Sequence, residues 1–146
     1  EILKLLIDRN VKWLLPFDHV ITDRLAPDAV PKVVTREGMP DDYRAVDIGP
    51  STVDMFGNVL AKSKTIFWNG PMGIFETVQF ASGTYSIALR IADCKAVTIV
   101  GGGDSIAAIN TLGIAGKFTH ISTGGGASLE FIQGLELPGI AALSEK

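Results

Sequence analysis

The sequence predicts an α/β domain built on a doubly wound parallel sheet. Three observations lead to this fold class. From residue 45 onward, apolar runs of strand length alternate with longer segments of helical periodicity, the order typical of a parallel sheet covered by helices. Residues 96–100, AVTIV, lack a strongly polar side chain, as expected of a strand buried on both faces. Glycine-rich turns also join several predicted strands to the helices that follow them.

Length and composition limit the class of protein further. The 146 residues correspond to one ordinary domain, and a hydrophobic content of 47% is enough to bury a core. No apolar run approaches the roughly 20 residues of a membrane helix. The single cysteine, Cys94, excludes an internal disulfide and suits a reducing compartment. Since the sequence opens at Glu1 inside a helical pattern, we expect it to begin within a larger protein.

The first 45 residues contain few clear elements. Residues 1–10 place apolar side chains on one face and are predicted to form a helix. Residues 11–16, VKWLLP, are predicted to form a short buried strand. Prolines interrupt residues 18–45, where we expect an outer strand at residues 33–35 and loops or turns elsewhere.

The rest of the chain alternates regularly between the two kinds of element. Strands are predicted at residues 45–49, 64–70, 96–100 and 119–122, and helices at residues 50–63, 78–94, 104–114 and 127–134. Connections between parallel strands are right-handed, so each of these helices is expected to cross over a face of the sheet.

Four predicted strands end in unusual turns, and ligands bind beyond the carboxyl ends of strands in open α/β sheets. The turns are residues 47–50, 69–76, 101–105 and 122–128. Two of them contain glycine triplets at a helix start, where a backbone without Cβ allows close approach and free N–H groups face an anion. A single triplet could serve only a tight turn. Two triplets on adjacent strands favour a phosphate site, with amides acting in place of side-chain cations in a chain of net charge −3.

Asp104 follows the first triplet and would repel a phosphate unless a cation stood between them. Mg²⁺ binds through one or two carboxylates together with phosphate oxygens, so we interpret Asp104 as a ligand of a metal–nucleotide. The alternative is that Asp104 only caps the following helix. Ser105 could cap equally well, and we assign it to capping and to a phosphate contact.

Several known fingerprints are absent. Neither triplet continues into GxGxxG, because Ile106 and Leu129 stand where the third glycine would be. Lys117 has neither the spacing nor the following Ser or Thr of a P-loop. The sequence has no GxSxG and no His/Cys cluster for zinc, and we expect His120 and Cys94 to be structural. A serine hydrolase and a nicotinamide-dependent oxidoreductase are therefore disfavoured.

Taken together, these blocks resemble the phosphoglycerate kinase family. The segments LLP…D, DIGP, NGPMGIFE, VGGGDS and HISTGGGASLE occur in the order and spacing of that family, across nearly the whole chain. The match corresponds to the latter part of the family's C-terminal, nucleotide-binding domain. Residues 1–146 are thus expected to be a partial, Rossmann-like domain of a two-domain kinase. The N-terminal substrate domain and the first part of the nucleotide-binding domain would be absent.

The resemblance implies a role for each matching residue. Asp104 would contact Mg²⁺ with its bound ATP or ADP. The nucleotide phosphates would be held by Asn69, Gly102, Gly103 and Ser105. Pro71 and Ile74 would flank the adenine, and Glu76 would form hydrogen bonds with the ribose hydroxyls. Gly49 would line the same cleft. Gly124, Gly125 and Gly126 would present amides to the phosphoryl group in transit.

The family reversibly transfers a phosphoryl group between 1,3-bisphosphoglycerate and ADP in glycolysis, giving 3-phosphoglycerate and ATP. The resemblance implies a monomeric, cytoplasmic parent enzyme with neither nucleic acid nor membrane as a partner. After Lys64, however, the basic residues are Arg90, Lys95, Lys117 and Lys146, none of them in a strand-end motif. Phosphoryl transfer also needs cations, so this chain resembles half a site. The alternative to a working kinase is a non-catalytic nucleotide-binding fragment.

Overall fold

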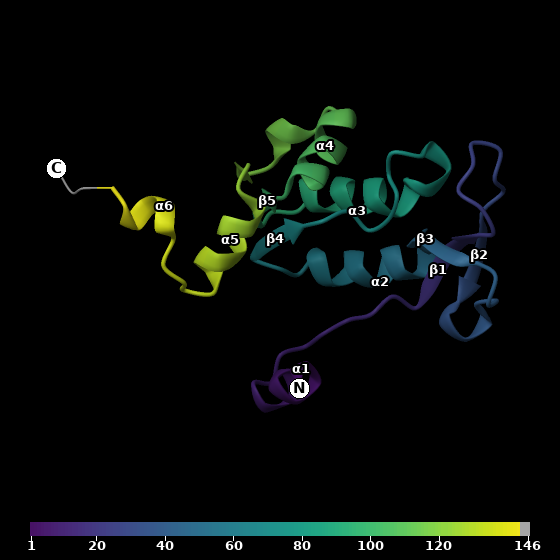
Figure 1. Cartoon of the computed structure of the whole chain (residues 1–146), viewed down its shortest axis with the longest axis horizontal. Helices are drawn as coiled ribbons and strands as arrows, with labels where there is room; N and C mark the ends of the chain where they lie inside the picture. Colours follow the sequence, from purple (N-terminus) through teal and green to yellow (C-terminus); the bar gives the residue numbers. More distant parts are fainter. Residues whose placement is uncertain (144–146) are drawn as a thin grey trace.

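The computed structural model describes residues 1–143 as a two-sheet α/β unit with an N-terminal helix set apart from it (Figure 1). In chain order the elements are α1 (Ile2–Asp8), β1 (Asp18–Thr22), β2 (Lys32–Thr35), β3 (Arg44–Ile48), α2 (Pro50–Leu60), β4 (Thr65–Asn69), α3 (Ser82–Ala92), β5 (Val97–Gly101), α4 (Gly103–Thr111), β6 (His120–Ser122), α5 (Gly125–Ile132) and α6 (Pro138–Ala141). None of the helices in this part of the chain is long and apolar enough to cross a membrane.

Strands β4, β5 and β6 form a parallel sheet in that order. The side chains of Ile66, Trp68 and Val100 belong to the main core, together with buried residues of α2, α3 and α4. Phe67 and Ile99 alternate with them and therefore point to the opposite face, where they lie near α5. Helices thus flank the sheet, and the predicted α/β fold class is confirmed.

The helices follow from the spacing of their apolar residues. In α3, buried residues recur at positions 84, 87, 88 and 91, which is the stripe of a helix that packs on one side. In α2, Pro50 occupies the first turn, where its missing N–H removes no hydrogen bond. The predicted helix at residues 78–94 instead begins at Ser82, after a single 3₁₀ turn at Val78–Phe80.

The second sheet is antiparallel, in the order β2-β1-β3, and it corrects two predictions. Residues 18–22, expected to lie in a loop, form the central strand β1. The strand at residues 44–48 pairs with β1 and does not join the parallel sheet. The sequence pattern concealed β1 because Asp18 and Thr22 are polar yet almost fully buried. Both find hydrogen-bond partners inside the fold, which makes their burial possible.

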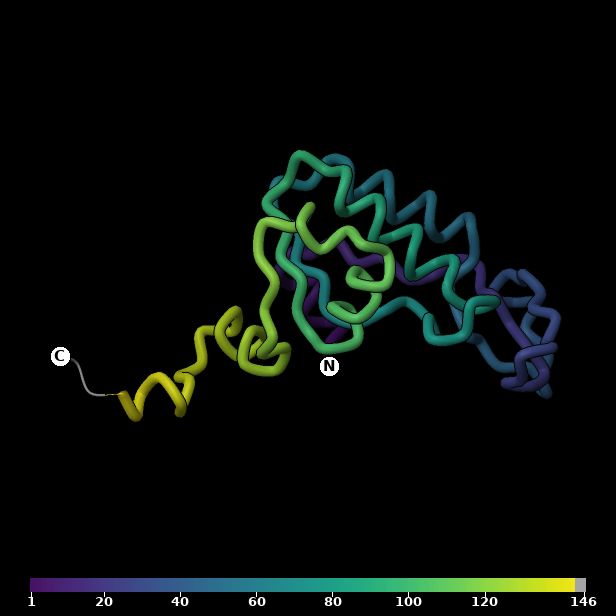
Figure 2. Tube along the Cα trace, turned by 90° about the horizontal axis from the view of Figure 1, so that it is seen from above, coloured from purple at the N-terminus to yellow at the C-terminus, as the bar shows by residue number. Residues whose placement is uncertain are grey.

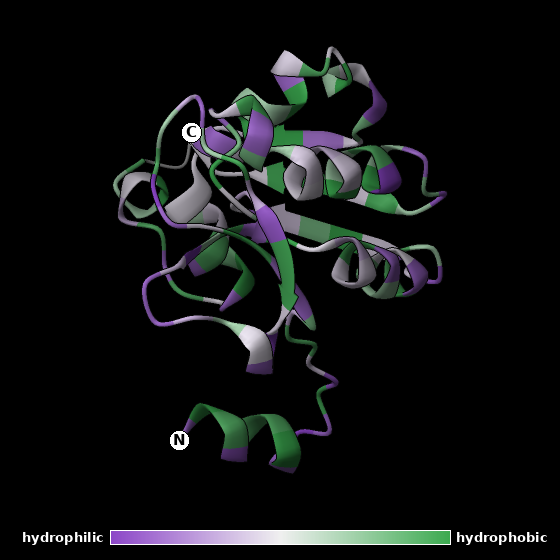
Figure 3. Cartoon of the chain, turned by 90° about the vertical axis from the view of Figure 1, so that its right-hand side faces the viewer, coloured by the Kyte–Doolittle hydropathy of each residue, from purple (hydrophilic) through white to green (hydrophobic). Residues whose placement is uncertain are grey.

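Residues 11–16 do not form the predicted strand. They run as extended chain between α1 and β1 (Figures 1 and 2), and Val11, Trp13 and Leu15 remain 45–49% exposed. An apolar run becomes a strand only where a neighbour completes its backbone hydrogen bonds, and no strand within residues 1–143 pairs with this one. Helix α1 forms as predicted but buries none of its residues, and this largely hydrophobic helix lies apart from the rest of the chain (Figure 3).

Candidate active site

The carboxyl ends of the three parallel strands lie level with one another. In the register of the sheet Asn69 pairs with Gly101, and Gly101 pairs with Ser122, so their turns leave from the same edge. The turn at residues 47–50 follows β3 in the antiparallel sheet. The prediction that four strand ends meet at one sheet edge is therefore wrong for this turn, and the candidate site is built from three.

The turns after β5 and β6 approach each other at backbone distance. A Cβ on Gly125 would lie 2.8 Å from both the Cα and the N of Gly102, and 3.2 Å from Oδ1 of Asn69. The same Oδ1 lies 3.0 Å from the Cβ position of Gly101 and 3.1 Å from that of Gly102. Only glycine allows such an approach at residue 125. Asn69, Gly102 and Gly125, each predicted as a site residue, are thus brought together from three strand ends.

Helix α4 begins beside this meeting point with open N–H groups. Gly102 adopts φ +86°, a conformation available to glycine, and Gly103 starts the helix with no side-chain cap. Asp104 lies in the first turn and is exposed. Its carboxylate neither occupies the cap position nor caps the helix, so the capping alternative for Asp104 is wrong. A free carboxylate and free amides therefore lie side by side.

The donors at this point fit a magnesium ion held jointly with a nucleotide. Within residues 1–143, no three His, Cys, Asp or Glu side chains gather closely enough to hold a metal by themselves. Mg²⁺ often takes one carboxylate from the protein and further oxygens from phosphates and water. Asp104 can supply that carboxylate, and its role as metal ligand stays a prediction.

Ser105 is fully buried, and its hydroxyl connects two turns of the site. The backbone N–H of Gly70 donates to Ser105 Oγ at 2.7 Å, which joins the turn after β4 to the start of α4. Ser105 is not the cap of α4, so its predicted capping role is wrong. Its contact with phosphate stays a prediction, because the observed bond runs to the protein backbone.

The turn after β4 carries the residues predicted to hold the adenine and ribose. Glu76 is exposed, while Pro71 and Ile74 are half-buried. Ile74 and Glu76 line a groove of about 440 Å³, and Leu25 and Pro27 from the β1–β2 connection line it with them. A groove of the volume typical of ligand sites thus lies beside Ile74 and Glu76, while Pro71 does not line it.

Sequence reasoning missed the contribution of the β1–β2 connection to this groove. The sequence predicts loops or turns in residues 18–45 apart from a strand at 33–35, and only the antiparallel pairing of β1 with β3 places the β1–β2 connection beside residues 74–79. The side-chain amide of Gln79 donates to the carbonyl of Pro27 and fastens the two segments together. The prolines at 27 and 31 were the available signal, since they mark a rigid turn.

Gly49 is buried at the start of α2, where a Cβ would overlap the carboxylate of Asp18. That carboxylate accepts the N–H groups of Ser51 at 2.9 Å and Thr52 at 2.7 Å. Burial by itself raises the pKa of Asp18, but the hydrogen bonds from Thr52 and Ser51 outweigh it, and the pKa is lowered overall. Gly49 therefore has a packing role here, and its place in the nucleotide cleft stays a prediction.

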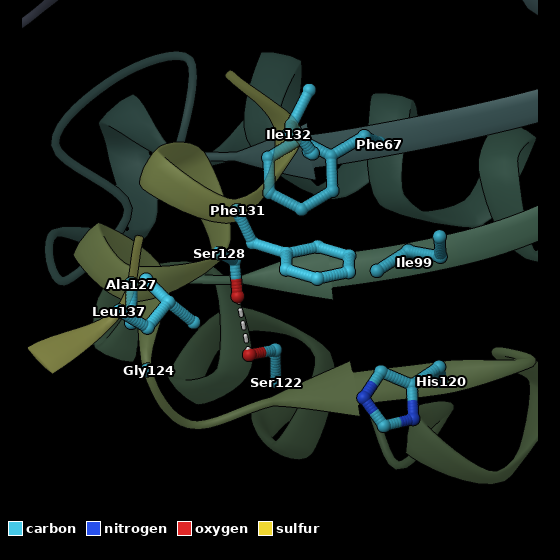
Figure 4. A pocket seen from close by; sticks show the side chains of 10 residues that line it. All are labelled: Phe67, Ile99, His120, Ser122, Gly124, Ala127, Ser128, Phe131, Ile132 and Leu137. Carbon is cyan, nitrogen blue, oxygen red and sulfur yellow. Dashed lines mark hydrogen bonds between the residues drawn. The ribbon is translucent and has the colours of Figure 1, made fainter. Parts of the chain in front are cut away.

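Glycines 124–126 form the start of α5, with Gly124 at the cap position. Gly124 and Gly126 are exposed and Gly125 is half-buried, so amides of this turn are accessible from the strand-end edge. On the open sheet face nearby lies a mostly apolar cavity of about 390 Å³, lined by Phe67, Ile99 and Phe131 among others (Figure 4). An apolar wall does not suit a phosphate, so the phosphate site belongs to the turns and not to this cavity.

Two hydroxyls hold α5 to the sheet at the edge of that cavity. Ser122 Oγ and Ser128 Oγ lie 2.5 Å apart and join the end of β6 to the second turn of α5 (Figure 4). His120, predicted to be structural, is exposed at the start of β6, the end of the strand remote from the turns. Cys94 is half-buried against the main core, as predicted.

The side-chain cations of the second half of the described chain lie away from the glycine turns. Arg90 pairs with Asp54, and Lys117 pairs with Asp93 at 3.1 Å. Arg90 lies in the last turn of α3, before β5, and Lys117 lies before β6. Both positions are at the amino ends of the strands, opposite the candidate site. Arg90 and Lys117 therefore contribute no charge to the glycine turns, and the expectation of a site built from amides and a carboxylate stays a prediction.

Comparisons with known proteins agree on one family. The family model for phosphoglycerate kinase matches residues 1–135. Phosphoglycerate kinases of Clostridium botulinum (strain Langeland) and Clostridium kluyveri (strain ATCC 8527) are each 52% identical over 139 residues, 95% of this chain. A solved phosphoglycerate kinase from Coxiella burnetii superimposes with a TM-score of 0.90 at 36% identity, over 95% of this chain and 36% of that one. One from Pyrococcus horikoshii gives a TM-score of 0.81 at 37% identity, over 96% and 34%.

The match covers only part of each relative's length. The chain spans only 35% of the length of these clostridial relatives. The motifs that carry the resemblance, NGPMGIFE, VGGGDS and HISTGGGASLE, supply the three turns that meet at the sheet edge. Sequence, fold and arrangement of these turns lead to one conclusion: the chain belongs to the phosphoglycerate kinase family, of whose members it covers about a third.

Proposed function

We propose that this chain is the nucleotide-binding part of an enzyme that transfers a phosphoryl group between 1,3-bisphosphoglycerate and ADP. The observation that carries the proposal is the meeting of Asn69, Gly102 and Gly125 at one sheet edge, beside the exposed carboxylate of Asp104. In the transfer, the bond between phosphorus and the acyl oxygen breaks and a bond to an oxygen of the ADP β-phosphate forms. 3-Phosphoglycerate leaves as the carboxylate.

In this proposal the chain's own groups position the phosphates and neutralise their charge. The amides at the start of α4 hold the nucleotide phosphates, aided by the helix dipole. When bound, Mg²⁺ supplies positive charge that is shared between phosphate oxygens, and Asp104 is the residue that would hold it. The amides of residues 124–126, at the start of α5, face the phosphoryl group in transit.

The other end of the nucleotide lies along the turn after β4. Glu76 is exposed at the groove, where its carboxylate can accept hydrogen bonds from ribose hydroxyls. Ile74 offers apolar surface to the adenine, with Leu25 on the neighbouring segment, and half-buried Pro71 precedes Ile74 along the turn. This direction places the phosphates toward Asn69 and α4, in keeping with the order of the residues along the turn.

In this proposal, other parts of the enzyme supply functions that this chain lacks. Arg90 and Lys117 lie at the amino ends of the parallel strands, away from the turns, although phosphoryl transfer relies on cations near the reacting phosphates. The matched relatives are almost three times as long as this chain. Binding of 3-phosphoglycerate and the missing positive charge are therefore assigned to the parts of the enzyme outside these residues. The chain itself is then a partial nucleotide-binding domain, of a cytoplasmic, glycolytic and monomeric enzyme.

A chimeric enzyme tests the proposal. The segment of Clostridium botulinum phosphoglycerate kinase that matches this chain is replaced by the matching 139 residues of this chain, and turnover is measured with 3-phosphoglycerate and Mg–ATP. We expect activity within about tenfold of the unmodified enzyme, and a loss of at least about a hundredfold in kcat when Asp104→Ala is added, because the metal carboxylate is removed.

The matched control is Asp93→Ala, which removes an exposed carboxylate whose surface pair with Lys117 adds little stability. It should leave both turnover and folding unchanged. An inactive chimera that is folded would contradict the proposed reaction. An Asp104→Ala chimera within a few fold of its parent would contradict the metal role.

A further inference from the structure

We propose that Thr84, a buried residue in the first turn of α3, is a positioning residue that holds the nucleotide-binding turn after β4 in shape. The inference rests on the proposed function, since it concerns how that site binds its nucleotide. No motif in the sequence points to Thr84, whose place in the helical stripe indicates only packing.

The geometry shows one hydroxyl serving two backbone groups of the turn. Thr84 is fully buried, and its Oγ1 accepts the N–H groups of Met72 and Gly73, each at 3.1 Å. These residues lie between Pro71 and Ile74, the two positions assigned to the adenine. The hydroxyl oxygen therefore fixes the middle of the segment that would contact the base.

The same turn also contacts β3. The N–H of Ile74 donates to the carbonyl of Val46 at 2.8 Å. A Cβ on Gly73 would overlap that carbonyl and lie 2.6 Å from the Cα of Asp47. Because both Thr84 and β3 bond to its backbone, the turn has little freedom to move. Its fixed shape lowers the ordering cost of binding a nucleotide.

Thr84 acts on the base end of the site and not on the phosphate end. Asp104 and the open amides belong to α4, which the turn contacts through a separate bond from Gly70 to Ser105. Loss of the Thr84 oxygen would leave two N–H groups facing a methyl group in a buried place, so the turn must shift to satisfy them. We expect weaker binding of the adenine and ribose, with the transfer chemistry little changed.

The test compares Thr84→Val, which keeps the shape but removes the hydroxyl, with Thr84→Ser, which keeps the oxygen. Both are made in the chimera described above, and kcat and KM for ADP are measured at a temperature where each variant is folded. Thr84→Val should raise the KM for ADP about tenfold, the effect of one net hydrogen bond, with kcat within about threefold. Thr84→Ser should restore the KM to within about twofold.

Thr98→Val is the matched control, because Thr98 is also buried and its Oγ1 accepts the N–H of Thr119 at 3.0 Å. Thr98 lies near the amino end of β5, away from the site, so its loss should lower stability and leave the KM unchanged. Equal KM values for Thr84→Val and Thr98→Val would overturn the inference, as would a Thr84→Val KM equal to that of the parent.

A second measurement is independent of turnover. In this chain alone, Thr84→Val should speed hydrogen exchange of the Met72 and Gly73 amides at least about tenfold relative to amides of β5. If these two amides kept their protection from hydrogen exchange, the inference that Thr84 holds the turn would be overturned. An inactive chimera without substitutions would instead count against the proposed function, while the exchange experiment would still decide the role of Thr84.

Discussion

Gly125 shows how strongly one residue can depend on its neighbours from other strands. A methyl group there would meet the backbone of Gly102, which cannot rotate away as a side chain can. We expect Gly125→Ala to lower the free energy of unfolding by about 1–3 kcal/mol, the usual effect of overpacking. Urea unfolding followed by circular dichroism measures this change.

The adjacent glycine provides the comparison. No atom lies within 4 Å of a Cβ placed on Gly126, which is inside α5 and has a helical backbone. Gly126→Ala should therefore raise the free energy of unfolding by about 0.5–1 kcal/mol, because alanine loses less chain entropy in a helix. Equal effects of the two substitutions would contradict the close approach of the two turns.

At the scale of single residues, the glycine motifs were the most readable part of the sequence. The glycine turns predict Gly102 and Gly125 as site residues, the family resemblance adds Asn69, and the structure brings the three together. Thr84 and Leu25 were not, because a buried threonine and an exposed leucine have no distinctive pattern. Their relation to the site depends on which backbone passes beside them.

At the scale of elements, two buried carboxylates hold helix starts to strands. Asp18 in β1 accepts N–H groups at the start of α2, and Asp47 in β3 accepts the N–H of Gly83 in α3 at 2.5 Å. Burial is the main influence on Asp47 and raises its pKa, against hydrogen bonds from Gly83, Ile48 and Thr84. The pKa of Asp18 is lowered by its hydrogen bonds despite burial.

These opposite shifts predict opposite pH effects. Asp18 stabilises the fold above its ordinary pKa of about 4, and this contribution is lost as the pH falls through its lowered pKa. Asp47 contributes stability below about pH 4, which is lost as the pH rises through its raised pKa. Asp18→Asn should therefore weaken the loss of stability on acidification. Between pH 4 and 6, the free energy of unfolding of Asp47→Asn should increase more, or decrease less, than that of the unsubstituted chain.

Urea midpoints measured from pH 3 to 7 check both slopes. Asp28→Asn is the control, since Asp28 forms an exposed pair with Arg24 and should leave the slope nearly unchanged. If Asp18→Asn and Asp47→Asn changed the slope in the same direction, the assignment of the two carboxylates would be wrong.

Element prediction succeeded where local pattern and tertiary environment agreed. Helices α2, α3 and α4 were expected from apolar periodicity, and strands β4 and β5 from short apolar runs. The sequence pattern does not predict strand β1, because its polar residues are buried through hydrogen bonds to other segments. The apolar run at residues 11–16 predicts a strand, but none forms because no neighbouring strand pairs with it in residues 1–143.

At the scale of the whole molecule, the chain combines a well-packed unit with surfaces that lack a partner in the described residues. Ile2 and Ile7 of α1 are 73% and 74% exposed, and Phe131 beside the open sheet face is 69% exposed. Single exposed apolar residues are ordinary, but a helix without any buried residue contributes little to stability. Such surfaces accord with a chain that spans 35% of its relatives.

This incompleteness predicts the behaviour of the isolated chain. We expect it to bind Mg–ADP weakly by calorimetry, because α4 and the groove are present. It should show no turnover with 3-phosphoglycerate and Mg–ATP in a coupled assay, because binding of 3-phosphoglycerate is assigned to parts of the enzyme outside these residues. The active chimera serves as the positive control. Turnover by the isolated chain would contradict the half-site interpretation.

Local spacing along the chain is enough to predict the family resemblance, the strand–helix order after residue 45 and the positions of the glycine turns. Tertiary structure decided which turns meet. It placed residues 47–50 after an antiparallel strand, turned Ser105 toward Gly70 and set Thr84 beneath the nucleotide turn. Those outcomes depend on backbone groups of distant segments finding hydrogen-bond partners. Side-chain patterns do not record that pairing, and only the folded chain completes it.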